Sequence, residues 1–510
     1  MIGIGILAVI KAANFTEYGS TRRTQLTSPR QLPSERNFIQ YAWLRMPEVG
    51  PAMLTGLILV PIAIAAMLVF AAGIWERFDP IGLTLLIWWV IAMVVVIRQS
   101  QRSDNKWYSL AGIVAFGLIL RGWSVVLTQE VALGADPMNY TNLARAVMNG
   151  QGLITDDWRY GEDLRAYFPP FYPLVLAAFW TVFGSSAFAT LAMNSIIDFT
   201  AAWALADVGR RLGSTASGRL AAIAYLSWPA FCLAAGIPQK ESLTLLLVML
   251  MLRSTAIWLK DNPDGRRRLR HGLWLGLWWG MLALTQPSLA LAPAAVALAL
   301  WTQAGFLPVL RLGLLSLPAF LLVLAPWWIR NWILLDSFIA FTTASGMMLN
   351  AALNDLRAPF PAGLFDLPEQ ERNSIMGQAA RKIIMANPLA ALEQMLRNLA
   401  YGFAFEEASL ARFRHTSPPI SGDDHARLAP VLQGSYTALL AATIAALWRG
   451  LRAGVTNAVT LYACALLLSI LVINPWFEFG ERHRLVLTPF FMVIAAGLFL
   501  PASRGNLRQS

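Results

Sequence analysis

The chain of 510 residues is long enough for several soluble domains, but its composition excludes that arrangement: 57% of the residues are hydrophobic, only 14% are charged, and the mean hydropathy is +0.53. Apolar runs near the length of a bilayer span recur from end to end, so the sequence predicts an all-α polytopic membrane protein. The net charge of +11 then reports membrane topology rather than nucleic-acid binding, because Lys and Arg gather in short clusters between the spans.

The chain carries no motif of a nucleotide-hydrolysing or zinc-dependent enzyme. It contains no P-loop, no G-x-G-x-x-G after a strand, no H-E-x-x-H and no Cys/His cluster. Cys232 and Cys464 fall inside predicted spans, where a cysteine is typically a small buried hydrophobe. The two cysteines therefore indicate neither a disulfide framework nor a metal site.

A polar, arginine-rich segment precedes the spans. Residues 1–51 begin with an apolar run that ends at Lys11 and is too short to cross a bilayer, so the segment is predicted to be a cytoplasmic tail. Twelve spans are predicted to follow, at approximately 52–73, 81–98, 108–127, 187–208, 219–235, 239–259, 272–285, 288–303, 308–326, 433–448, 455–473 and 484–501.

The distribution of basic residues tests this count, because Lys and Arg concentrate in short cytoplasmic loops. With twelve spans, one set of alternate connections is basic and contains Arg98, Arg102, Lys106, Arg210, Arg211, Arg219, Lys260, Arg266, Arg267, Arg268, Arg270, Arg311, Arg449, Arg452, Arg504 and Arg508. The opposite short loops contain only Arg77, Lys240, Arg482 and Arg484. Both termini are therefore predicted to be cytoplasmic, and the long loops 128–186 and 327–432 are predicted to lie outside.

The first long loop contains an acidic residue at the start of a short helix. Asp136 and Pro137 are the residue types preferred at the N-cap and first position of a helix, and Tyr140 follows one turn later. Gly150 and Gly152 are predicted to end this helix. A role as a helix cap alone would explain Asp136, and the residues leave that alternative open.

The rest of the two loops is predicted to be helical in part. The apolar segment Phe171 to Phe183 is too short for a span and is predicted to lie in the membrane interface, because counting it as a span would invert the sidedness of Arg210 and Arg211. The second loop has little apolar density and is sufficient for a small helical cap. Asp156 and Asp157 are predicted to form a solvated loop face.

Ionisable and polar residues converge on the predicted outer face, where a charge is costly unless it is paired or hydrated. Besides Asp136, they are Lys240, Glu241, Gln286, Arg330, Glu481, Arg482, His483 and Arg484. Glu241 also suits the first turn of a helix, and Arg330 beside three tryptophans suits an interfacial anchor. Arg482 and Arg484 both suit flanks of the last span. Asp198, inside a span, is predicted to make a polar contact between helices. Acids and arginines gathered outside, where no ATP is available, favour a reaction on a lipid-linked phosphate.

A series of short motifs follows a fixed order along the chain: 136–140 with Ala144 and 150–152, 167–173 followed by 183–184, 209–213, 238–241, 285–287, 326–331, 387–388 and 481–489. In order and spacing these motifs resemble the GT-C superfamily of polyprenyl-phosphate-sugar-dependent glycosyltransferases, close to the protein mannosyltransferase and lipid A aminoarabinose transferase group. The resemblance covers roughly residues 108–500. Gln286 departs from it, because family members often carry Lys or Arg there, and residues 1–100 have no counterpart.

The resemblance implies a GT-C-like core over 108–326, preceded by two extra spans and a loop over 52–107. It also implies an outer cap over 327–432 and three final spans with a short tail over 433–510. The implied activity is that of an inverting transferase at the outer face, with Asp136 as the catalytic base and Glu241 as a second acid.

We therefore expect a glycosyltransferase that moves a sugar from a polyprenyl monophosphate to a lipid, glycan or protein acceptor at the periplasmic face of a bacterial inner membrane. The expected catalytic residues are Asp136 and Glu241, and the expected substrate-binding residues are Tyr140, Tyr167, Lys240, Gln286, Arg330, Arg482, His483 and Arg484. No cofactor is required, although a divalent metal between the acids fits this chemistry. Two alternatives remain: a ligase or polymerase that uses a diphosphate-linked glycan, and a lipid flippase or transporter, which would favour an inverted repeat and charges near mid-membrane.

Overall fold

The structure is a computed structural model that describes residues 79–100, 111–129, 135–157, 159–261, 265–404, 406, 422–452, 458–477 and 481–499. All of these belong to one compact unit, Pro47–Ser510. The predicted tail over 1–51, the predicted span 52–73 and the final residues from 500 onward lie outside the described part.

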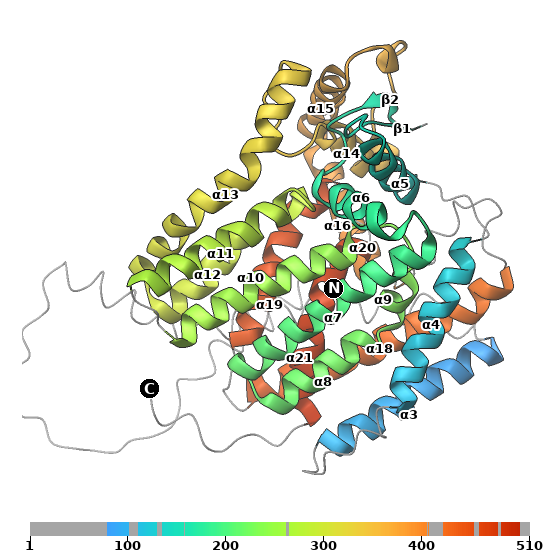
Figure 1. The fold of residues 1–510 in the computed structure, drawn as a ribbon, viewed down its shortest axis with the longest axis vertical. Helices are drawn as coiled ribbons and strands as arrows, with labels where there is room; N and C mark the ends of the chain where they lie inside the picture. Colours follow the sequence, from blue (N-terminus) through green and yellow to red (C-terminus); the bar gives the residue numbers. More distant parts are fainter. Residues whose placement is uncertain are drawn as a thin grey trace, which may run out of the picture. The chain divides into compact units, whose positions relative to one another are not determined.

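Seven helical segments in the described ranges are long and apolar enough to cross a membrane: α3 (Pro80–Ser100), α7 (Ala187–Leu212), α10 (Glu241–Asp261), η3 with α12 (Pro287–Ala304), α13 (Phe306–Leu335), α18 (Gly422–Arg452) and α20 to α21 (Arg482–Phe499). They are accompanied by the helices α4 (Ala111–Gln129), α8 (Thr215–Leu226), α9 (Pro229–Ala234), α11 (Gly265–Ala283) and α19 (Ala458–Ile473). Figure 1 shows these helices side by side. The predicted class, a helical polytopic membrane protein, is confirmed, and the count of twelve spans stays a prediction.

Two element boundaries near prolines differ from the predicted ones. The segment predicted as one span over 219–235 is divided into α8 and α9, because Pro229 disfavours helical backbone at Trp228, which is extended with φ −65° and ψ 121°. By contrast, α13 continues through Pro318 and Pro326 to Leu335, beyond the predicted end at 326.

Close packing of α11 against α13 depends on three glycines at four-residue spacing, Gly272, Gly276 and Gly280. A Cβ atom at Gly276 would lie 1.9 Å from the backbone oxygen of Ser316, closer than any real contact. Small residues at this spacing are the usual means by which membrane helices approach closely, since packing rather than hydrophobic exclusion holds helices together in lipid.

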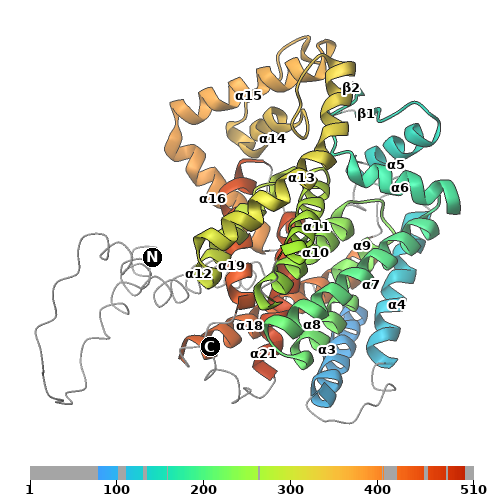
Figure 2. The same cartoon turned by 60° about the vertical axis from the view of Figure 1, so that its left-hand side comes forward.

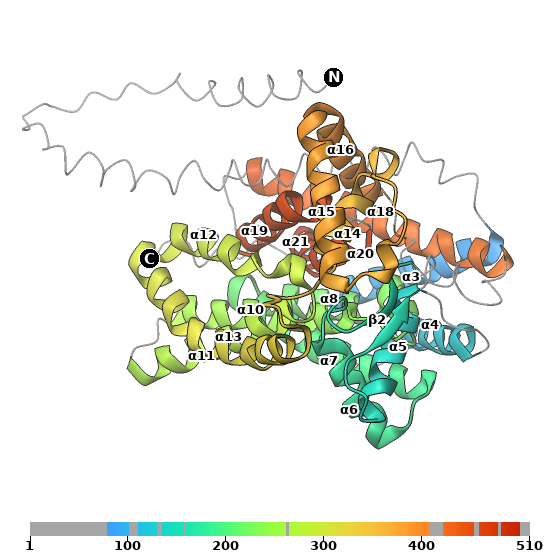
Figure 3. The same ribbon diagram turned by 90° about the horizontal axis from the view of Figure 1, so that it is seen from above.

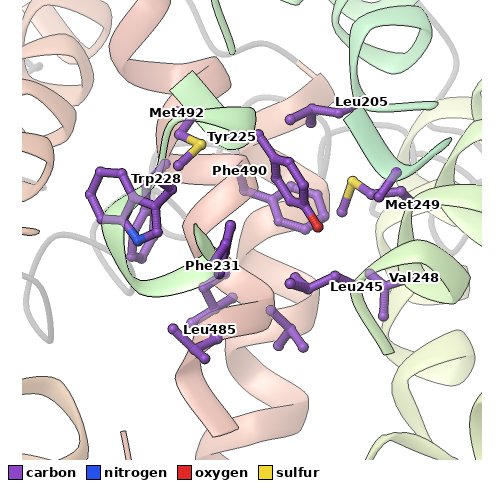
Figure 4. Packing of buried hydrophobic residues seen from close by; sticks show 14 of the residues in the cluster. Leu205, Tyr225, Trp228, Phe231, Leu245, Val248, Met249, Leu485, Phe490 and Met492 are labelled. Carbon is purple, nitrogen blue, oxygen red and sulfur yellow. The ribbon is translucent and has the colours of Figure 1, made fainter. Parts of the chain in front are cut away.

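The hydrophobic core lies where α8 and α9 meet α10 and α21. Figure 4 shows side chains of this region packed against one another, including residues of the neighbouring α7 and η8 (Leu485–Leu487); labelled there are Leu205, Tyr225, Trp228, Phe231, Leu245, Val248, Met249, Leu485, Phe490 and Met492. Both cysteines are buried and free, as predicted.

The two long loops that were predicted to lie outside fold mostly into short elements. The first contains α5 (Ala135–Met148), a hairpin of β1 (Thr155–Asp157) and β2 (Gly161–Leu164), and α6 (Phe171–Phe183), whose bounds match the prediction. The second contains α14 (Ser345–Ala352), η4 (Asn354–Leu356), η5 (Leu364–Asp366), α15 (Glu369–Ala386) and α16 (Pro388–Ala404). These elements gather at one end of the helices, as Figure 2 shows.

Hydrogen bonds join the two loops to each other. The Glu369 carboxylate on α15 accepts from the backbone N–H groups of Arg165 and Ala166, at 3.1 and 2.9 Å. One turn later, Arg372 donates to the carbonyl oxygens of Tyr160 and Glu162, at 2.8 and 3.1 Å. The second loop therefore holds the backbone of the first loop in place beside the cavity described next.

Candidate active site

A cavity of about 1050 Å³ lies between the two loops and the ends of the helices. Its wall includes the start of α5, the turn before α10, η3, α14, α16 and the short helix α20 (Glu481–Arg484). Among the described lining residues, Asp136 is the one carboxylate, and Arg159, Lys240 and Arg482 bring positive charge to the same cavity. A cavity of this size is at the upper end of the range for small-molecule sites.

Asp136 lies in the first turn of α5, and its side chain is turned to two arginines. Its Oδ2 accepts a hydrogen bond from Arg482 Nη1 at 2.6 Å, and its Oδ1 accepts one from Arg159 Nη2 at 3.2 Å. The helix itself begins one residue earlier, at Ala135, which has a left-handed backbone with φ +54°. The carboxylate is thus engaged with cations that line a cavity, an arrangement that a helix cap alone does not require.

Buried polar contacts fix the position of Arg159. Its Nε donates to Asp157 Oδ1 at 3.1 Å and its Nη2 to Asp157 Oδ2 at 2.8 Å, and Asn139 on α5 also donates to Oδ2. Asp157 is only 2% exposed, so the prediction that it forms a solvated loop face is wrong, whereas Asp156 is exposed. The reason is the β1–β2 hairpin, which turns alternate residues of β1 inward.

The charges around Asp136 control its ionisation. Burial on its own would raise the pKa of the Asp136 carboxyl, but the charges of Arg482 and Arg159 outweigh burial and hold that pKa below its usual value. Burial also raises the pKa of Tyr140, one turn along α5, so its hydroxyl keeps its proton. The ground state therefore presents an ionised carboxylate beside a protonated phenol.

The structure brings seven predicted site residues to the wall of this cavity: Asp136, Tyr140, Tyr167, Lys240, Gln286, Arg482 and His483. Aromatic side chains form one face, where the Tyr140 ring meets Tyr172 edge-on at 5.2 Å between centroids and Phe168 at 5.8 Å. Gln286, at the N-cap position of η3, donates to the hydroxyl of Ser288 at 2.8 Å. Residues from three distant parts of the chain therefore meet at one cavity.

Glu241 lies behind this wall. It is the first residue of α10 and lines a separate pocket of about 20 Å³. The walls of this pocket and of the large cavity have Gln286, Asn474, Arg482 and His483 in common. A space of that size holds about one water molecule. Glu241 is therefore placed next to Arg482 rather than in the cavity itself.

Two predicted substrate-binding residues, Arg330 and Arg484, are not among the residues that line the cavity. Arg330 Nη1 donates to the carbonyl oxygen of Arg165 at 2.9 Å and to Asn331 Oδ1. Its Nη2 donates to the carbonyl oxygen of Leu153 at 3.1 Å, and the guanidinium stacks on the Trp327 ring. Arg330 therefore connects α13 to the first loop, which agrees with an anchoring role and disfavours a role as a phosphate ligand.

Arg484 is turned into the protein. Its side chain is 0% exposed, forms an ion pair with Glu406, donates to the carbonyl oxygen of Gly402 at 2.9 Å and stacks on the Tyr436 ring at 3.9 Å. With these contacts Arg484 stabilises the junction between α16 and α18 and does not contact the cavity, so its predicted role in substrate binding is not supported.

Several lining residues were not predicted from the sequence. Arg159 is the main one, and a signal existed, because it follows Asp157 within the acidic loop that carries Asp136. A group from the second loop was also missed and consists of Asn354, Gln394, Arg397, Asn398 and Tyr401. Among the residues that the structure describes, no group of three or more His, Cys, Asp and Glu side chains could hold a metal ion.

Comparisons with known proteins concern the fold. No family model matches the chain, and neither does any curated protein sequence. The chain is similar to solved structures of two proteins. One is the archaeal oligosaccharyltransferase AglB from Archaeoglobus fulgidus, in complex with an inhibitory peptide and a dolichol-phosphate, with 14% identity and a TM-score of 0.43 over 76% of this chain and 50% of that protein. The chain thus spans about half the length of AglB.

The other is ArnT from Cupriavidus metallidurans bound to undecaprenyl phosphate, with 14% identity and a TM-score of 0.36 over 76% of both chains. A further crystal form of the Archaeoglobus fulgidus oligosaccharyltransferase, with zinc and sulfate, is 16% identical, with a TM-score of 0.38 over 77% of this chain and 54% of that protein.

Proposed function

We propose that the protein is an inverting glycosyltransferase that moves a sugar from a polyprenyl monophosphate to an acceptor hydroxyl at the periplasmic face of a bacterial inner membrane. The observation that carries this proposal is the position of Asp136, a carboxylate in a cavity that also contains Arg159, Lys240 and Arg482. The reaction needs a base for the acceptor and cations for the departing phosphate, and this cavity contains both.

Asp136 acts as the general base in this mechanism. Its carboxylate takes the proton from the acceptor hydroxyl while the oxygen attacks the anomeric carbon of the donor sugar. The bond from that carbon to the phosphate oxygen breaks on the opposite face, which inverts the configuration, and the electron pair leaves with the polyprenyl phosphate. The protonated Tyr140 donates a hydrogen bond to one of the substrates beside Asp136.

The arginines determine when Asp136 becomes an effective base. In the absence of donor, Arg482 and Arg159 depress the pKa of the Asp136 carboxyl and so weaken its basicity. A bound phosphate competes for the same guanidinium groups, because the planar guanidinium group matches the geometry of both phosphate and carboxylate oxygens. Arg159 is held by the buried Asp157, so Arg482 is the group that moves to the phosphate, and the pKa of Asp136 rises when the donor arrives.

Replacement of Asp136 with Asn tests the proposal. Asn keeps the size of the side chain and an oxygen that accepts from one of the two arginines, but it cannot take a proton, so transfer should fall at least roughly a hundredfold. The measurement is the glycolipid and glycan profile, by mass spectrometry, of a deletion strain that carries the Asn variant. Glu162→Gln, the same chemical change at an exposed side chain of the same loop, is the matched control and should retain activity. Transfer near the parental rate by the Asn variant would exclude Asp136 as the base.

The donor class is tested separately with purified enzyme. A polyprenyl-monophosphate sugar should support transfer, and the corresponding diphosphate-linked donor should not. Transfer from the diphosphate donor alone would instead identify a ligase or polymerase. Movement of the lipid-linked sugar across vesicles without transfer, insensitive to Asp136→Asn, would identify a flippase.

A further inference from the structure

The cavity has a second end whose chemistry differs from that around Asp136. Four residues of α16 line it at positions that share one helix face: Gln394, Arg397, Asn398 and Tyr401. Asn354, Met348 and Ala351 from α14 and η4 complete this wall. Figures 2 and 3 show α16 and α5 on different sides of α14, so this end is apart from the start of α5.

Asn398 determines the orientation of the other amides. It is 8% exposed, and its Nδ2 donates to the carbonyl oxygens of Ala352 at 2.8 Å and Pro475 at 3.4 Å. Because those two partners are acceptors only, the amide nitrogen must face them and Oδ1 must face the cavity side. That oxygen accepts from Asn354 Nδ2 at 2.9 Å and from Gln394 Nε2 at 3.0 Å.

Two amide oxygens are consequently presented to a ligand. Asn354 and Gln394 each use their NH₂ group on Asn398, so Oδ1 of Asn354 and Oε1 of Gln394 are directed away from it and accept no hydrogen bond from the protein residues described. Asn354 has a left-handed backbone with φ +48°, a conformation that asparagine tolerates better than most residues and that recurs at functional sites. A bound molecule that matches this wall must offer hydrogen-bond donors.

The remaining side chains indicate a neutral, polyhydroxylated ligand. Tyr401 is 58% exposed and provides a flat aromatic face beside the amides, which suits the C–H face of a sugar ring. Arg397 forms an ion pair with Glu393 at 2.6 Å, so the one cation among the described residues of this wall is already balanced. A phosphorylated ligand would favour an unbalanced cation here, and a cationic ligand would favour a carboxylate.

We infer that Asn354, Gln394, Asn398 and Tyr401 form the acceptor subsite and that they bind a neutral carbohydrate whose hydroxyl group reaches Asp136. This inference rests on the proposed function and specifies the acceptor class that it left open. A transferase must hold two substrates at once, and the charged end and the amide-lined end of one cavity provide a separate environment for each.

Site-specific photo-crosslinking in living cells tests the subsite with whatever acceptor the cell supplies. Benzoylphenylalanine is placed at Tyr401 for the amide-lined end and at Phe168 for the charged end, and the adducts on the purified full-length protein are identified by mass spectrometry. Position 401 should capture carbohydrate, seen as sugar fragment ions, and position 168 should capture polyprenyl phosphate.

Substitutions that remove single side-chain amides make the test quantitative, because the amount of carbohydrate adduct at position 401 can be compared between variants. Gln394→Ala and Asn354→Gly, the latter retaining a residue that tolerates positive φ, should each reduce the carbohydrate adduct at 401 roughly threefold to tenfold, the effect of one neutral hydrogen bond. Neither should change the polyprenyl adduct at 168. Leu392→Ala, at an exposed position of α16 that does not line the cavity, is the matched control and should change neither adduct.

The possible failures are distinguishable. If position 168 captures polyprenyl phosphate while position 401 yields peptide, polyprenyl or no adduct, the carbohydrate subsite is wrong and the proposed transferase stands. If the carbohydrate adduct at 401 does not respond to either amide substitution, these amides are not the subsite. Loss of the polyprenyl adduct at 168, with Asp136→Asn fully active, would overturn the proposed function itself.

Discussion

The ionisation of Asp136 has a measurable consequence for the pH dependence of the reaction. Arg482 and Arg159 lower the pKa of this carboxyl, so in the free enzyme the base stays ionised as pH falls to about 4, near the usual value for Asp. Because kcat/KM reports the free enzyme, it should show no acid limb from Asp136 above that pH. In the donor complex Arg482 has moved to the phosphate, so the acid limb of kcat should lie at higher pH. Identical acid limbs in kcat and kcat/KM would contradict the exchange of Arg482.

Conservative replacement of two arginines should distinguish an arginine that binds the donor from one that stabilises the fold. Arg482→Lys keeps the charge but loses the planar fork, so donor KM should rise and turnover should fall about tenfold or more. Arg330→Lys removes hydrogen bonds to backbone carbonyl oxygens and the contact with Trp327, so it should lower the thermal unfolding temperature. Its donor KM should remain near the parental value. Steady-state kinetics and thermal unfolding in the same detergent measure both effects, and a raised donor KM with unchanged stability for Arg330→Lys would restore it as a phosphate ligand.

Sequence reasoning located most of the candidate site because polar residues at a membrane face are rare and conspicuous. Its errors have specific physical causes. Arg482 and Arg484 were both expected to bind substrate, but residues two apart on a helix point to different sides, and the structure turns Arg484 inward to Glu406. Arg159 was missed because its role depends on Asp157, which becomes buried only when the hairpin folds and Asp157 meets Asn139 on α5.

At the scale of helices, the contact between α11 and α13 should be the least tolerant of added volume. Gly276→Ala would bring a methyl group onto the Ser316 carbonyl oxygen, so the helices must separate, and the thermal unfolding temperature should fall by several degrees. Gly313→Ala on α13 has nothing within 4 Å of the new atom and replaces a helical glycine, so it should be neutral or slightly stabilising. Equal unfolding temperatures for the two variants would show that the helices are not closely packed.

Elements with a strong local pattern were predicted well, and those held by distant contacts were not. The apolar segment Phe171–Phe183 has the predicted bounds, because proline and glycine residues flank it. The β1–β2 hairpin was not predicted, since its short strands show little alternation of apolar and polar residues. It is supported by Arg372, more than 200 residues further along the chain, and no local pattern contains that information.

At the scale of the whole molecule, the predicted topology requires α15 to be outside and the start of α11 to be cytoplasmic. Ser374→Cys and Arg267→Cys, both at exposed positions, can be introduced singly after Cys232 and Cys464 are replaced. An impermeant thiol reagent added to intact spheroplasts should label position 374 and leave position 267 unlabelled. The reverse pattern would place the cavity on the cytoplasmic face and would contradict the use of a donor presented outside.

The ion pair between Asp136 and Arg482 joins residues 346 positions apart, and this separation sets the order of events during synthesis. At a translation rate of about 5–20 residues per second, Arg482 leaves the ribosome roughly 20–70 s after Asp136. Throughout that interval the nascent chain already contains the base but not the cation that is proposed to move to the donor phosphate. Under the proposed mechanism, transfer should therefore begin only after α20 has been made and Arg482 has reached Asp136.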